Sequence, residues 1–287
     1  MNQRGSNTLR ARAEKKAADR LEALSGRLIF RETHAGYTKR PEENLIPGIE
    51  ANDFWPDLGA GAGNELVDGS RDPAKFCAAF SSSALAVNAF GPFRHRPQNL
   101  DLLGYRRFSE AQFEKPLPTG LLGTAPHLDF YVAGSGNLVC IESKFLETLW
   151  PKAAKFADSY QGAITSLAEP MWRSVYTELK ANPRLFKFLD AAQLVKHYLG
   201  MRNTLGSVKA EQALLYVYWE PANAGDIEEF CRHRDEVRHL TEAVSGGQIK
   251  FVARSYRQLW DEWRDTSSWA GMEAHLSNLE QRYSFSI

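Results

Sequence analysis

Few cysteines, no long apolar run and no excess of either charge characterise this sequence of 287 residues. Its three cysteines are widely spaced, which excludes a disulfide framework and a zinc pattern. No stretch reaches the roughly 18 apolar residues that a membrane span needs, and no secretory signal pattern opens the chain. We therefore expect a cytoplasmic protein with no membrane contact. Basic and acidic residues number 35 each, a balance that speaks mildly against a nucleic-acid binder.

The basic residues gather in the first 40 positions, where ten lysines and arginines stand against four acids, an excess of six. An exposed helix is predicted over residues 7–25, and beyond it prolines and glycines break every period up to about residue 70. The chain therefore divides into a basic N-terminal helix and irregular arm, residues 1–70, and an α/β domain, residues 71–287. The basic cluster can dock a phosphate backbone, but a solvated helix is the commoner reading.

The stretch that carries the chemistry begins at residue 126 and reads PHLDFYVAGSGNLVCIESKFLE. Two β-runs, residues 127–132 and 138–144, are joined by Gly-Ser-Gly-Asn, a cluster typical of a hairpin turn. If the turn is centred within this cluster, Asp129 lies opposite Glu142. Lys144 shares their face because side chains alternate along a strand. Two carboxylates and an ammonium in one small patch are costly for a purely structural sheet face.

A divalent metal site is the most economical explanation of this patch. Mg²⁺ takes oxygen ligands and commonly binds through one or two carboxylates with water and phosphate. Asp129, Glu142 and the backbone carbonyl of Ser143 would supply such ligands, and Lys144 would orient or help deprotonate the water that attacks a phosphodiester. The alternative is a solvated sheet face with weak ion pairs. Apolar side chains on the same face argue against that alternative.

The pattern formed by Asp129 and Glu142-Ser143-Lys144 resembles the PD-(D/E)XK nuclease superfamily, which has the restriction-endonuclease-like fold. The resemblance implies that the acidic pair binds Mg²⁺ or Mn²⁺ and that the lysine belongs to the catalytic set. Residues 82–92 and 190–197 also look similar to poorly characterised bacterial members. One departure is a proline that stands three residues before Asp129 rather than beside it. The implied activity is metal-dependent hydrolysis of nucleic acid, most simply by a DNA endonuclease of restriction type.

Further candidate residues lie outside the hairpin. Gln193, Lys196 and His197 fall at i, i+3 and i+4, on one face of a predicted helix. We expect Gln193 to support water or substrate and the other two to contact nucleic acid, although a histidine there is more often a packing residue. Arg106 and Arg107 are candidate contacts to a phosphate backbone, against the default reading of surface arginines.

The remaining pattern predicts the fold. A helix is expected to open at Asp72-Pro73, a first extended segment near residues 102–108, and two later strands at 213–219 and 249–255. This order predicts an α/β restriction-endonuclease-like core with a central mixed sheet of about five strands flanked by helices.

The function expected from these observations is that of a Mg²⁺-dependent nuclease acting on double-stranded DNA. A homodimer is compatible with it. An acid from the arm, Glu42, Glu43, Glu50 or Glu65, is a candidate to complete the metal site. The alternative is a catalytically inactive module of the same fold that binds nucleic acid without cutting it.

Overall fold

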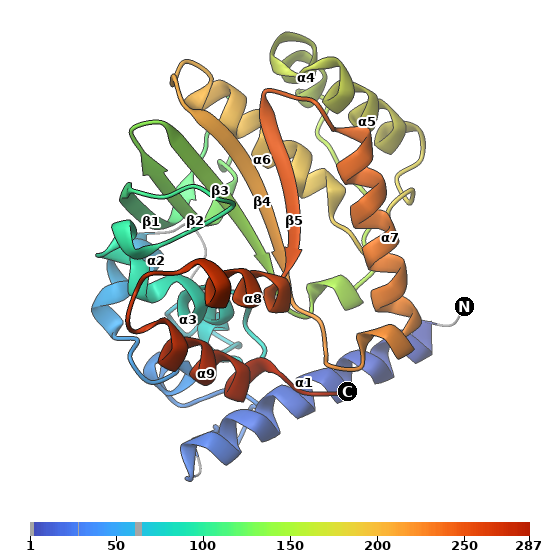
Figure 1. Cartoon of the computed structure of the whole chain (residues 1–287). Helices are drawn as coiled ribbons and strands as arrows, with labels where there is room; N and C mark the ends of the chain where they lie inside the picture. Colours follow the sequence, from blue (N-terminus) through green and yellow to red (C-terminus); the bar gives the residue numbers. More distant parts are fainter. Residues whose placement is uncertain (1–2, 28, 61–64) are drawn as a thin grey trace.

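The computed structural model describes residues 3–27, 29–60 and 65–287, which form one five-stranded sheet with helices on both faces (Figure 1). The predicted α/β architecture with a central mixed sheet is confirmed. The strands are β1 (Phe108–Pro116), β2 (His127–Gly134), β3 (Asn137–Lys144), β4 (Glu211–Tyr218) and β5 (Ile249–Ser255). The helices are α1 (Gln3–Ser25), α2 (Trp55–Ala60), α3 (Ser82–Arg94), α4 (Tyr160–Leu167), α5 (Pro170–Ala181), α6 (Ala191–Leu205), α7 (Glu228–Ala243), α8 (Tyr256–Thr266) and α9 (Met272–Tyr283).

The sheet follows the order of the chain, and its pairing changes at β3. Strands β1, β2 and β3 pair antiparallel, whereas β3, β4 and β5 pair parallel. In the hairpin, Phe130 pairs with Ile141 and Ala133 with Leu138, which is the register expected from the glycine-rich turn. If this register is continued by one residue, Asp129 lies opposite Glu142. Parallel β4 is buried on both faces, as its apolar and aromatic sequence requires.

Two hydrophobic cores lie on the two faces of the sheet. The core on one face takes residues from α1, α2, α3, α8 and α9, and the other takes residues from α4 to α7 (Figure 1). Leu138 and Cys140 of β3 belong to the second core. Because side chains alternate along a strand, Glu142 and Lys144 lie on that same face. The site is therefore covered by the layer that contains α6.

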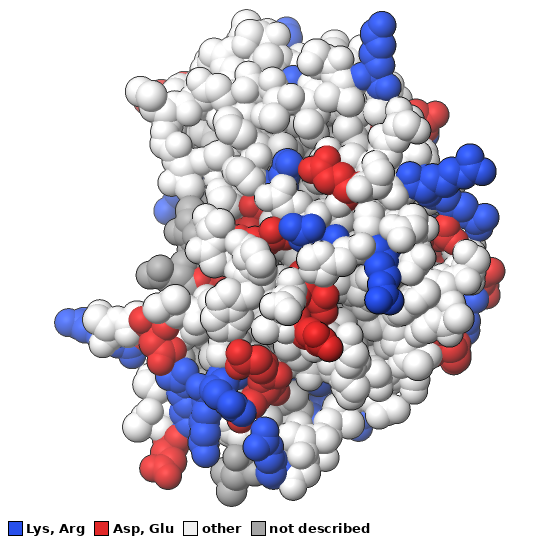
Figure 2. All heavy atoms as spheres, turned by 90° about the vertical axis from the view of Figure 1, so that its left-hand side faces the viewer, with Lys and Arg blue, Asp and Glu red and all other residues white. Residues whose placement is uncertain are grey.

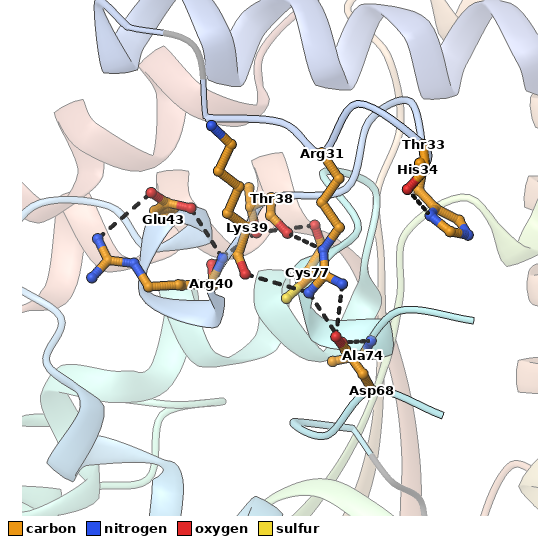
Figure 3. Close-up of polar contacts among 10 residues, drawn as sticks. All are labelled: Arg31, Thr33, His34, Thr38, Lys39, Arg40, Glu43, Asp68, Ala74 and Cys77. Carbon is orange, nitrogen blue, oxygen red and sulfur yellow. Dashed lines mark hydrogen bonds and ion pairs between the residues drawn. The ribbon is translucent and has the colours of Figure 1, made fainter. Parts of the chain in front are cut away.

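The N-terminal segment packs on the rest of the chain through the first core. Ala13 and Ala17 of α1 are fully buried there. The arm that follows is held by Arg31, which donates to the carbonyl of Thr38 at 2.9 Å and pairs with Asp68 at 2.7 Å (Figure 3). A boundary near residue 70 remains a prediction, because these contacts do not say which part folds alone.

Two elements differ from their predicted positions. The helix expected from Asp72 begins instead at Ser82, because Ser81 caps it and its hydroxyl accepts a hydrogen bond from the amide of Ala84 at 3.2 Å. The first strand runs over residues 108–116, beyond the extended segment expected near 102–108. In the described part of the chain, no helix is long and apolar enough to cross a membrane.

Candidate active site

The two hairpin strands separate where the candidate site begins. The pairing of β2 with β3 ends at Phe130 and Ile141, and Asp129 instead accepts a hydrogen bond from the amide of Ser143 through Oδ2, at 2.6 Å. The Ser143 hydroxyl lies on the opposite face, 2.7 Å from the hydroxyl of Tyr256. Asp129 is thus fixed beside β3 by the backbone while it remains partly exposed.

Glu142 and Lys144 form an ion pair beside Asp129, and this pair is deeply set. The side chains of Glu142 and Lys144 are only 2% and 12% exposed. Removal of two charges from water is costly, so a buried pair persists only where each charge keeps its partner. The register of β2 and β3 puts Asp129 on the same face as this pair, and the metal-binding and catalytic roles of the three residues remain predictions.

His197 of α6 approaches Glu142 from the covering layer. Its side chain is 1% exposed, and its Nε2 lies 2.8 Å from Oε2 of Glu142, without the geometry of a hydrogen bond. Its Nδ1 has no hydrogen-bond partner within the described ranges. Gly200, one turn along α6, lets the helix pack closely against Leu117, because a Cβ there would overlap the carbonyl oxygen of that residue.

The charges of the site shift the pKa of each acid differently. Burial alone would raise the pKa of Glu142, but the charges of Lys144 and His197 outweigh it and lower that pKa to about 2. Burial and the charge of Glu142 together raise the pKa of Asp129 well above its ordinary value. Burial opposes the charge of Lys144, yet the surrounding carboxylates, Glu142 first, raise its pKa. The raised pKa of Asp129 reflects burial and repulsion from Glu142, and a bound cation would relieve that repulsion.

Glu114 is a site residue that the sequence analysis missed. It lies on β1 at the position that the strand register sets opposite Asp129, with a φ of 48° that non-glycine residues seldom adopt. Burial, then the charges of Glu65 and Glu142, raise its pKa to about 7. The sequence signal is a glutamate within an extended run, but without β1 in the predicted sheet no register connects it to Asp129.

Of the four arm acids considered from the sequence, Glu65 is the one whose charge acts on this cluster. It accepts a hydrogen bond from the Ser83 hydroxyl at 3.1 Å and pairs with Lys75 at 3.1 Å. Glu43 instead accepts from the amide of Arg40, in the arm itself. Across residues 3–27, 29–60 and 65–287, no three or more His, Cys, Asp and Glu side chains are grouped to hold a metal ion.

The other candidates on α6 lie apart from the carboxylates. The ammonium of Lys196 lies over the rings of Phe156 and Tyr160, at 5.7 and 5.8 Å from their centres. Gln193 is half-buried, and its backbone amide donates to the capping carboxylate of Asp190 at 3.1 Å. Of the predicted trio, the structure brings His197 to Glu142.

Arg106 and Arg107 lie at the other end of β1 from Glu114. Arg106 pairs with Asp101 at 3.0 Å and donates to the carbonyl of Thr266 at 3.2 Å. Figure 2 shows the face on the left of Figure 1, where acidic and basic side chains are intermingled. This mixture agrees with the net charge of zero, and any role of the two arginines in binding remains a prediction.

The chain was also compared with known proteins. A family model described as "Restriction Endonuclease associating with ARP" matches residues 51–284. No curated protein and no solved structure matches the chain. The matched range contains 234 of the 287 residues, and it includes the whole sheet together with Glu114, Asp129, Glu142, Lys144 and His197. The protein therefore belongs to the family of restriction endonucleases associating with ARP.

Proposed function

We propose that this protein is a metal-dependent nuclease of the PD-(D/E)XK type that hydrolyses phosphodiester bonds in double-stranded DNA. The observation that supports this most strongly is the meeting of Asp129, Glu142 and Lys144 where β2 and β3 separate. The family match supports the broader statement that the protein is a nuclease. Partly exposed Asp129 gives the buried pair an opening toward a substrate.

The residues fit a hard divalent cation such as Mg²⁺ or Mn²⁺. Asp129 and Glu142 would hold it, together with the backbone carbonyl of Ser143, and all of these ligands are oxygens, as Mg²⁺ prefers. The raised pKa of Asp129 supports this fit, because a neighbouring cation would relieve the repulsion between the two carboxylates. When bound, the ion would polarise the phosphate and offset the charge of the departing oxygen.

Lys144 acts as a fixed positive charge in this proposal. Because its pKa is raised, the ammonium keeps its proton at neutral pH. It therefore orients the attacking water and stabilises negative charge that develops on the phosphate, and it does not serve as the base.

His197 is a positioning residue in the same scheme. Its burial and its contact with Glu142 fit the role of holding that carboxylate ionised and in place. Direct contact with nucleic acid, the role first expected for it, fits its burial less well.

The more distant basic residues remain candidates for contacts along the duplex. Phe108, which follows Arg107, stands six positions before Glu114, so the arginines lie at least about 20 Å along β1 from the cluster. A duplex crosses that span in roughly six base pairs. Lys196 and Gln193 would meet the strand nearer to the cut. The family description adds association with ARP, and we propose that this nuclease works with such a partner.

Cleavage assays test the proposal. Wild type and Lys144→Ala would be incubated with supercoiled plasmid, linear duplex and single-stranded DNA, with Mg²⁺, Mn²⁺ or EDTA. We expect cleavage of duplex that requires metal and falls by roughly 10²- to 10⁴-fold in the variant. Lys209→Ala is the matched control, because Lys209 is an exposed lysine just before β4, at the opposite end of the sheet from Lys144. Metal-independent cleavage, or equal rates in wild type and Lys144→Ala, would contradict the proposal.

A further inference from the structure

A narrow pocket opens beside Lys144, between the 3-10 helix Glu147–Leu149 and the segment that leads into α6. Its walls include Thr148, Lys152, Lys187 and Asp190. The enclosed space is about 10 Å³, which is room for one oxygen-sized group such as a water molecule or a single phosphate oxygen. Because Lys144 forms part of the wall, whatever enters this pocket lies next to the proposed catalytic residues.

Thr148 brings an unsatisfied hydroxyl to this pocket. Its side chain is 3% exposed, and Oγ1 has no hydrogen-bond partner among the residues that the structure describes. An unpaired hydroxyl in the interior costs free energy, since it gives up its bonds to water without a replacement. Because Thr148 lines the pocket, a group that enters the pocket can form a hydrogen bond with this hydroxyl.

Three lysines and two acids line the pocket, and one of the lysines, Lys144, is paired with Glu142 outside it. The other lysines are Lys152 and Lys187, and the acids are Glu147 and Asp190. Both acids are occupied locally, because Glu147 accepts from the amide of Phe145, the residue after β3, at 2.7 Å and Asp190 caps α6.

Of the three lysines that line the pocket, Lys187 is the one without an ion pair among the residues that the structure describes. Its ammonium lies 5.0 Å from the centre of the Phe188 ring and makes no ion pair with any carboxylate in the described part of the chain. Lys152, by contrast, lies 3.5 Å from Asp190. Lys187 is thus available to an anion at the mouth of the pocket.

Trp150 extends the rim with an aromatic surface. It is 59% exposed, and the guanidinium of Arg10 from α1 lies 4.3 Å from the centre of its ring. The basic N-terminal helix therefore reaches the rim, although Arg10 is also paired with Glu14 at 2.6 Å. Cations and exposed aromatic rings are the combination that nucleic-acid strands bind.

We propose that this pocket is a phosphate-binding subsite for the DNA strand, which holds a backbone phosphate next to the one that is cut. One non-bridging oxygen enters the pocket and accepts a hydrogen bond from Thr148 Oγ1, while the ammonium of Lys187 pairs with the same phosphate. The subsite rests on the proposed nuclease function, because its ligand is the substrate strand. It assigns a binding role to two residues outside the carboxylate cluster.

Binding measurements test the subsite separately from cleavage. A fluorescent DNA duplex would be titrated with wild type, Thr148→Val, Lys187→Ala and the control Lys209→Ala, without Mg²⁺ and at several salt concentrations. We expect Kd to rise about 3- to 10-fold in each subsite variant. The slope of log Kd against log salt should fall by about 0.9 in Lys187→Ala, as for the loss of one phosphate contact. Thr148→Val should keep or raise the unfolding temperature, since it removes an unpaired hydroxyl.

The possible outcomes separate the two proposals. Wild-type affinity and salt slope in both variants, with cleavage intact in wild type, would overturn the subsite and leave the nuclease assignment standing. Weaker binding in both variants without cleavage by wild type would support the phosphate site and overturn the nuclease assignment. If wild type neither binds nor cuts the duplex, both proposals fail.

Discussion

Arg282 and Glu142 are both almost wholly buried charges, but their surroundings differ. The Arg282 guanidinium donates to the carbonyls of Ala17 and Ala79, at 3.0 and 2.7 Å, and to the Asn44 side chain at 3.3 Å. These acceptors come from α1 and from two segments before α3. Arg282 thus joins three segments of the chain through neutral acceptors, as a structural charge does.

Glu142 instead lies among other ionisable groups. Lys144 and His197 balance its charge, while Asp129 and Glu114 add further carboxylates to the same space. Carboxylates placed close together lower the stability of the folded state through repulsion. Such arrangements are typical of functional sites, where activity requires them. Burial alone therefore does not distinguish a functional charge from a structural one. The distinguishing feature is the presence of a cluster of neighbouring groups with charge of the same sign.

Replacement of an acid at the site should have the largest effect, because it should lower the rate of cleavage strongly without lowering the stability of the protein. Asp129→Asn keeps an oxygen to accept from the Ser143 amide and removes the repulsion with Glu142. We expect the rate of DNA cleavage to fall by on the order of 10³-fold, since the bound ion contributes several kcal/mol. The unfolding temperature should stay the same or rise. A large loss of stability in this variant would mean that Asp129 is a structural residue.

Replacement of the structural charge should have the opposite result. Arg282→Met removes the donor that joins acceptors from three segments, so we expect a loss of about 3 kcal/mol or more in the free energy of unfolding, measured by chemical denaturation. Below the unfolding transition, the pH dependence of cleavage should be that of wild type. Arg264→Met is the control, because the ion pairs of Arg264 are at the surface and worth little. Similar losses in both variants would remove the distinction drawn for Arg282.

His197 should affect the chemistry by a smaller amount. His197→Ala removes one of the charges that lower the pKa of Glu142, so that pKa should rise. We expect a fall in kcat of about 10- to 100-fold, with the acidic limb of the pH profile moved to higher pH. KM should change little, and Lys196→Ala should leave the acidic limb where it is in wild type. A uniform loss of activity at every pH would indicate a packing role alone.

Replacement of Glu114 should have the smallest effect, and this effect concerns the pH dependence of the stability of the protein. Its pKa is raised from 4.5 to about 7, so the folded state keeps a proton that the unfolded chain has released. Stability should therefore decrease as pH rises from 4.5 to about 7 and receive no further change from this group above that range. Thermal unfolding in EDTA should show a weaker decrease for Glu114→Gln. An unchanged pH dependence would mean that Glu114 titrates normally.

The hairpin could be predicted because its determinants are local. The glycine-rich turn sets the register, and the two-residue period of a strand then assigns Asp129, Glu142 and Lys144 to one face. The same reasoning gave the central sheet, since β4 is apolar and aromatic and β5 contains Ile249, Phe251 and Val252, residue types that favour strands.

The contacts that complete the site could not be predicted, because they join elements distant in sequence. His197 meets Glu142 only when α6 is packed on the face of β3 that carries this glutamate. Glu114 reaches the cluster only through the pairing of β1 with β2, and the long connection between these strands does not fix their register from the sequence. Thr148 has no sequence signature at all, since only the packed structure reveals that its hydroxyl lacks a partner among the described residues.

Direct measurement of metal binding is the most incisive test of the assigned site. Mn²⁺ would be titrated into wild type, Asp129→Asn and the control Lys209→Ala, with free Mn²⁺ followed by electron paramagnetic resonance. We expect wild type and the control to bind Mn²⁺ at a site from which Mg²⁺ displaces it, and Asp129→Asn to lose that site while it remains folded. Equal binding by Asp129→Asn, or no binding by wild type, would contradict a metal-dependent nuclease centred on Asp129 and Glu142.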